Sequence, residues 1–186
     1  MMSLQDYIHF SHIGDDFIKD KPLLISKLVT QHKWSQKIYD KKKSNVFSVA
    51  YNNLRYLDPI FEKTLTEYKK IFQDNIEIDE EKTKRQSFCL IQNDECNAYS
   101  WHHHEPKSKG AWYDDSPTLL ISSVYYIRLP SGSGGIKFKD DSEEIEFMPS
   151  EGDLIFFPHT MLHTPALSTC REYRVSFNIN IFPKNL

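Results

Sequence analysis

The sequence of 186 residues is poor in several features that would define a protein class. Its three cysteines, Cys89, Cys96 and Cys170, are scattered and form no CxxC pair. So few thiols argue against a disulfide framework and favour a reducing compartment. No apolar run approaches the length of a membrane span, and the first residues lack the basic-then-apolar pattern of a signal peptide. We therefore expect a cytoplasmic protein with no membrane association.

The sequence also lacks an excess of charge of either sign. Its 23 basic and 26 acidic residues give a formal net charge of −3. Such a balance produces no strong field toward nucleic acid or an anionic membrane. The composition thus disfavours nucleic acid as a partner and favours a small-molecule or peptide substrate, whose identity the residues do not reveal.

The length and the apolar content of 39% fit one domain with its own core. The pattern changes near residue 86, so we expect helical support over residues 1–85 and a β-rich catalytic core over residues 86–186. Asp58-Pro59 supplies a helix N-cap with proline at the first helical position. An apolar stripe at helical spacing follows it: Phe61, Leu65, Tyr68 and Phe72. A second helix is predicted to begin near Lys21, and residues 76–85 are expected to be a connection.

After residue 86, short runs rich in β-branched and aromatic residues alternate with turn residues. The predicted strands cover residues 87–92, 119–129, 136–139, 145–147, 153–157 and 173–181. Many short strands with frequent turns predict a sandwich or barrel, a class that includes the jelly roll. The fold class expected is therefore mainly β with flanking helices, which are also candidates for a homodimer contact.

The last predicted strand alternates strictly. Arg174, Ser176, Asn178 and Asn180 lie on one face, and apolar residues lie on the other. The polar face either meets water or lines the interior of the β-rich core. The pattern alone does not decide between the two.

The run from Trp101 to Pro106 holds the strongest chemical signal. In an extended segment, residues two apart share a face, so His103-x-Glu105 offers two metal ligands side by side. With His163, they form a set of two histidines and one carboxylate that holds non-haem Fe(II) with open positions. The same run offers a second frame, His102-x-His104, which would give a three-histidine site.

These residues occur in an ordered series with other short motifs. Gly134-Gly135 precedes a strand, the segment 152–158 has the pattern Gly-Asp-x-x-x-Phe-Pro, and Arg174 follows His163 by eleven residues. The series resembles the Fe(II)/2-oxoglutarate-dependent oxygenase superfamily, in particular its prolyl-hydroxylase-like members, over the C-terminal half of the chain. The resemblance implies a double-stranded β-helix, or cupin-like jelly roll, behind the N-terminal helical segment.

The resemblance also implies the roles of the site residues. His103, Glu105 and His163 would be the catalytic metal ligands for Fe(II), with 2-oxoglutarate and O2 as cosubstrates. Arg174 would bind the distal carboxylate of 2-oxoglutarate through its planar fork, with a hydroxyl from Ser176 or Tyr125 beside it. The implied reaction is hydroxylation of a substrate with release of succinate and CO2.

Other interpretations stay open at this stage. One is a cupin-type enzyme that uses His102, His104 and His163 without 2-oxoglutarate. Another is a jelly-roll binding protein without catalysis. Arg171 competes with Arg174 for the anion, but it falls in a turn-like segment. Residues 107–117 are equally consistent with a lid over the substrate and with a surface loop.

Overall fold

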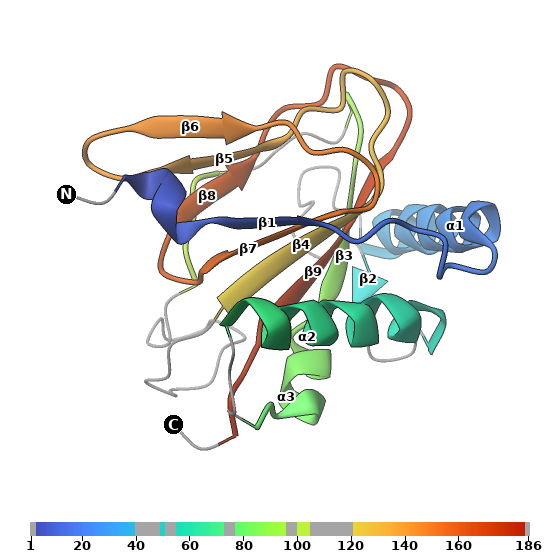
Figure 1. Cartoon of the computed structure of the whole chain (residues 1–186). Coiled ribbons are helices and arrows are strands. Elements are labelled where there is room, and N and C mark those ends of the chain that lie inside the picture. The colour runs from blue at the N-terminus through green and yellow to red at the C-terminus, as the bar shows by residue number, and fades with distance from the viewer. Residues whose placement is uncertain are drawn as a thin grey trace.

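The computed structural model describes residues 3–39, 49–50, 55–72, 77–95, 100–104 and 121–184 (Figure 1). Its helices are the 3-10 turns Leu4–Tyr7 and Arg55–Leu57 and the α-helices α1 (Lys21–Tyr39), α2 (Asp58–Phe72) and α3 (Glu80–Arg85). The strands are β1 (His9–His12), β2 (Val49–Ala50), β3 (Phe88–Gln92), β4 (Ile121–Arg128), β5 (Ile136–Lys139), β6 (Glu144–Phe147), β7 (Asp153–Pro158), β8 (Leu162–Pro165) and β9 (Arg174–Ile181).

The strands form two antiparallel sheets. The larger has six strands in the order β1-β7-β4-β9-β3-β2, and the smaller has three in the order β6-β5-β8. The described part of the chain is thus mainly β with helices, as predicted. The adjacent pairs β4–β9 and β3–β9 place the C-terminal strand in the middle of the larger sheet.

The helices cover one face of the larger sheet (Figure 1). Leu24 and Leu28 of α1 and Ile60, Phe61 and Leu65 of α2 join one buried apolar cluster. The strands contribute the residues of one parity to it, among them Cys89, Ile91, Tyr125, Val175, Phe177 and Ile179. Period-two alternation therefore directs the remaining strand residues to the opposite face.

That opposite face looks toward the three-stranded sheet. Val124, Ile155 and Phe157 of the larger sheet pack with Ile136 and Phe138 of β5 in a second apolar cluster. The polar face of β9 lies between the sheets as well, because Ser122 and Val124 are paired with Asn180 and Asn178. The polar face of β9 therefore lines the interior of the β-rich core and does not face water.

The N-terminal half holds more than the helices expected of it. α1 and α2 begin where the sequence predicts, at Lys21 and Asp58. However, β1 pairs with β7 at one edge of the larger sheet. The expectation of a connection over residues 76–85 is wrong in part, because Asp79 caps α3 by accepting a hydrogen bond from the Lys82 amide at 2.9 Å. None of the described helices is long and apolar enough to cross a membrane.

Docking of α1 on the sheet gives a stability prediction. Leu28→Ala removes a fully buried side chain, whereas Leu23→Ala, on the same helix, truncates one that is 49% exposed. We expect Leu28→Ala to lower the free energy of unfolding by about 2–5 kcal/mol, since it leaves a cavity in the core. Urea denaturation of both variants measures the difference. Equal effects of the two substitutions would contradict the packing described here.

Candidate metal centre

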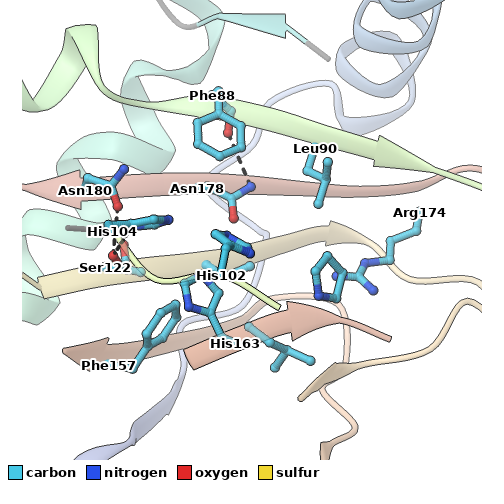
Figure 2. A pocket seen from close by; sticks show the side chains of 14 residues that line it. Phe88, Leu90, His102, His104, Ser122, Phe157, His163, Arg174, Asn178 and Asn180 are labelled. Carbon is cyan, nitrogen blue, oxygen red and sulfur yellow. Dashed lines mark hydrogen bonds between the residues drawn. The ribbon is translucent and has the colours of Figure 1, made fainter. Parts of the chain in front are cut away.

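Three histidines from two distant segments meet between the sheets (Figure 2). The ligand atoms of His102, His104 and His163 all lie within 4.8 Å of one another. The backbones of His102 and His163 form a pair of hydrogen bonds, with N–O distances of 3.1 and 2.9 Å. The His104 amide donates to the His159 carbonyl at 2.8 Å. The segment before residue 105 is thus fastened along β8 and the turn preceding it.

Hydrogen bonds at Nδ1 orient the three rings. His102 Nδ1 lies 3.1 Å from the Ser100 carbonyl, and His163 Nδ1 lies 2.8 Å from the Met161 carbonyl. A carbonyl only accepts, so each Nδ1 is the donor, and in a neutral ring the lone pair is then on Nε2. His104 Nδ1 lies 3.0 Å from Ser122 Oγ.

The surroundings keep these rings neutral. Burial, followed by the repulsion from His102, lowers the pKa of His104 to about 3. Burial, then His104 and His102, lowers the pKa of His163 well below its usual value. Burial lowers the pKa of His102 too. Neutral imidazoles with converging lone pairs are ligands for Fe(II), Zn(II) and similar divalent ions, so the donor set fits a metal.

A buried cation lies on the same side of the sheet. Arg174, 1% exposed, donates from Nη1 to the Gly135 carbonyl at 2.8 Å, and its Cζ lies 5.6 Å from the centre of the Tyr126 ring. Burial lowers the pKa of the guanidinium, although the neighbouring Tyr126 opposes this shift. Among the described residues, no carboxylate forms a salt bridge with Arg174.

Polar atoms around Arg174 point to a missing ligand. Arg174 Nε, Tyr126 OH and Ser176 Oγ are buried and have no hydrogen-bond partner in the described part of the chain. Cross-strand pairing of Tyr126 with Ser176 places these groups on the inner face. Buried polar groups are normally hydrogen-bonded, so two unmatched hydroxyls beside a guanidinium without a carboxylate partner among the described residues fit an anionic ligand such as a carboxylate.

A narrow cavity connects the histidines with Arg174 (Figure 2). The centres of water-sized atoms can occupy about 30 Å³ in this cavity. Its walls combine the polar face of β9 with apolar side chains, including Phe88, Leu90, Ile136, Phe157 and Pro165. Asn178 stands midway along the cavity and donates from Nδ2 to the Phe88 carbonyl at 3.5 Å.

The site residues expected from the sequence are brought together in part. His163 and Arg174 line the cavity, and Ser176 lies on the same face of β9. His102 and His104, the second frame, join His163, whereas His103 does not belong to this group. Glu105 and the loop 107–117 lie outside the described residues. The His102–His163 bridge explains the frame, because alternation from His102 brings residue 104 to the same side.

Tyr125 lies on the other side of the sheet. Its hydroxyl donates to the Gly14 carbonyl at 2.7 Å, and its ring belongs to the cluster beneath the helices. The neighbouring Tyr126 faces Arg174 instead. Strand parity relative to Arg174 distinguishes the two tyrosines, and this parity depends on a cross-strand register that the residues of β4 do not specify.

No protein-family model matches the chain, and no curated protein matches it. Solved structures with a similar fold include prolyl hydroxylases and a member of the 2OG-Fe(II) oxygenase family. The chain is similar to the viral collagen prolyl hydroxylase of Paramecium bursaria Chlorella virus-1, in its 2OG complex, with a TM-score of 0.54 and 16% identity over 96% of this chain and 98% of that one. It is also similar to a Pseudomonas putida prolyl-4-hydroxylase, with a TM-score of 0.51 and 14% identity over 96% and 89% of the two chains.

A third similar structure is the non-haem α-ketoglutarate-dependent epimerase SnoN from nogalamycin biosynthesis. Its TM-score is 0.57 at 11% identity, over 95% of this chain and 77% of that chain. The resemblance to the Fe(II)/2-oxoglutarate oxygenases that the sequence indicates is therefore confirmed for the fold.

The neutral histidines predict a pH dependence of stability in metal-free protein. In the unfolded chain, a histidine takes up a proton below about pH 6.5, whereas these three stay neutral in the fold. The free energy of unfolding should therefore decrease as pH falls below 6.5 and continue to decrease toward the folded pKa, about 3 for His104. Each histidine contributes at most about 1.4 kcal/mol per pH unit.

Urea denaturation in EDTA between pH 7.5 and 5.5 measures this dependence. A His163→Ala variant should have a shallower slope, because one of the three groups is missing. Identical slopes for the variant and the original protein would show that His163 is not held neutral in the fold.

Proposed function

We propose that this protein is a non-haem Fe(II)- and 2-oxoglutarate-dependent dioxygenase that hydroxylates a small-molecule or peptide substrate. We further propose that its two sheets form the double-stranded β-helix of that superfamily. The observation that supports this most strongly is the buried Arg174. It has no carboxylate partner among the described residues and is connected by one cavity to three converging histidines.

The proposed metal ligands are His102, His104 and His163. Their ligand atoms lie within 4.8 Å of one another, so small side-chain shifts would bring them to one ion. The frame with His103 and Glu105, expected from the sequence, would need the segment to turn over and give up the backbone bonds of His102 to His163. Histidine thus takes the place of the carboxylate that the superfamily pattern has two residues after the first ligand.

The residues of the chain divide the work of binding. Fe(II), when bound with 2-oxoglutarate and O2, supplies the oxidative chemistry that yields succinate, CO2 and a hydroxylated product. Arg174 neutralises the distal carboxylate and donates to it, and Tyr126 and Ser176 offer hydroxyls to the same group. The apolar walls limit access of water, which strengthens these charge interactions.

The narrowness of the cavity sets a condition on this function. The centres of water-sized atoms have about 30 Å³ between the described walls, which is little for 2-oxoglutarate, so we expect lining side chains to separate as it enters. Arg174 has little freedom to move, because Nη1 is bonded to the Gly135 carbonyl. The apolar side chains Leu90 and Ile136 make no such bonds through their side chains, and we expect them to move instead.

The three-histidine set favours a second candidate. A cupin-type enzyme with this set and without 2-oxoglutarate would use the same metal ligands and would not need a cation in the cavity. This second function gives no ligand to the buried Arg174 guanidinium or to the hydroxyls of Tyr126 and Ser176 beside it. We therefore rank it second, ahead of a non-catalytic jelly-roll binding protein.

Anaerobic loading with Fe(II) followed by 2-oxoglutarate tests the proposal. We expect a weak visible charge-transfer absorption between the ion and the 2-oxo acid, and succinate formation once air is admitted. His163→Ala should abolish both. Metal binding without the absorption band would favour the second candidate.

Replacement of Arg174 separates binding of the cosubstrate from binding of the metal. Loss of one partner of a buried charged pair costs about 2–5 kcal/mol, so Arg174→Ala should weaken 2-oxoglutarate binding roughly 30-fold or more. Arg171→Ala is the matched control, since Arg171 is exposed in the preceding turn. Calorimetric titration of the Zn(II)-loaded proteins measures both. Equal 2-oxoglutarate affinities of the Arg174→Ala and Arg171→Ala proteins would show that Arg174 does not bind the cosubstrate.

A further inference from the structure

A chain of hydrogen bonds connects one proposed metal ligand to the backbone at the end of α3, and Figure 2 shows its first part, from His104 through Ser122 to Asn180. His104 Nδ1 lies 3.0 Å from Ser122 Oγ, Ser122 Oγ lies 2.9 Å from Asn180 Oδ1, and Asn180 Nδ2 lies 3.2 Å from the Gln86 carbonyl. Ser122 is 2% exposed and Asn180 is 3% exposed. Their side chains are therefore shielded from solvent that would otherwise compete for these bonds.

The end of the chain fixes the direction of every bond in it. The Gln86 carbonyl can only accept, so the Asn180 amide must turn its NH2 group toward it. Asn180 Oδ1 then faces Ser122 and accepts a hydrogen bond from its hydroxyl. Because this hydroxyl hydrogen is already donated to Asn180, Ser122 Oγ can only accept a hydrogen bond from His104 Nδ1. A neutral His104 thus has its proton on Nδ1 and its lone pair on Nε2.

His104 needs this arrangement more than the other two histidines. Main-chain carbonyls fix the tautomers of His102 and His163 directly. The group next to His104 Nδ1 is the Ser122 hydroxyl, which both donates and accepts and so accommodates either tautomer, and the Asn180 side chain is a further hydrogen-bond partner of His104. A carboxylate at this position, as in the superfamily pattern, would have no tautomer to select.

We propose that Asn180, acting through Ser122, is a positioning residue that holds His104 in the Nδ1–H tautomer and thereby directs Nε2 to the metal. This inference rests on the metal centre of the proposed function. In metal sites, the group behind a histidine ligand typically accounts for 10- to 100-fold of the metal affinity, roughly. Asn180 and Ser122 occupy this place behind His104.

Nitrogen NMR of the metal-free protein at pH 8 tests the tautomer. Long-range proton–nitrogen correlation spectra distinguish the protonated ring nitrogen from the bare one. We expect His104 to show Nδ1–H in the original protein, and a mixture of tautomers or the Nε2–H form in Asn180→Leu and Ser122→Ala. An Nε2–H tautomer in the original protein would overturn the inference.

Metal affinity provides a second readout that does not depend on turnover. In Co(II) titrations followed by visible absorption, Ser122→Ala and Asn180→Leu should bind about 10- to 100-fold more weakly. Ser122→Thr keeps the hydroxyl and should restore the affinity. Ser123→Ala is the matched control, because Ser123 is equally buried but its hydroxyl donates to the Ile179 carbonyl.

The two failures can be told apart. If the original protein binds Co(II) but Ser122→Ala binds as well as Ser123→Ala does, the positioning role is wrong and the metal centre stands. If the tautomer of His104 is Nδ1–H but the original protein binds no divalent ion, the hydrogen bonds through Ser122 and Asn180 orient a histidine that is not a metal ligand. That result would refute both the inference and the proposed function.

Discussion

Two backbone hydrogen bonds between His102 and His163 determine the geometry of the candidate site. They join a segment before β4 to the strand β8, which belongs to the smaller sheet. Because both imidazoles project from this bridge, their separation is set by the main chain and not by flexible side chains. Alternation along the segment then places the His104 side chain on the same side as that of His102. The hydrogen bond from the His104 amide to the His159 carbonyl holds the segment in place. The main chain therefore brings the three histidines within reach of one another.

The cation at the other end of the cavity depends on a glycine turn. Gly134 has a φ of 69°, in the left-handed region that favours glycine. A Cβ on Gly135 would lie 1.8 Å from the Phe147 carbonyl oxygen, so no other residue fits between β5 and β6. The same Gly135 offers its carbonyl to Arg174. The close pairing of the smaller sheet therefore brings an acceptor to the guanidinium and holds it in the interior.

The outline of the fold could be predicted from local patterns. The proline and the apolar stripe after Asp58 predicted α2, and the strict alternation up to Ile181 predicted β9. Three strands escaped prediction, β1, β2 and β8, and for β1 and β8 the reason is physical. β1 has the sequence His-Phe-Ser-His and is largely exposed, so it has little apolar alternation. β8 is only four residues long and ends in proline, and pairing with β5 defines it more than its own propensity does.

The sequence indicated which residue types make up the candidate site, but it did not indicate which frame of the histidine run meets His163. His163 and Arg174 stood out because the order of motifs placed them. The choice between His102-x-His104 and His103-x-Glu105 depends on which residue meets β8 across the cavity, a long-range register that spacing within the run does not contain. Tyr126 and Ser122 were missed for the same reason. A serine or tyrosine in a strand becomes informative only when its partner on the next strand is known.

The bond between Asn180 and the Gln86 carbonyl has a consequence at the surface of the molecule. Gln86 is the residue that ends α3, where main-chain carbonyls lack partners within the helix. One of them is occupied by a side chain that belongs to the interior network. The helix end is thus connected by hydrogen bonds to a buried imidazole, and unwinding of its last turn would remove one bond of this network. A six-residue helix outside the sheets is thereby connected to the polar network between them.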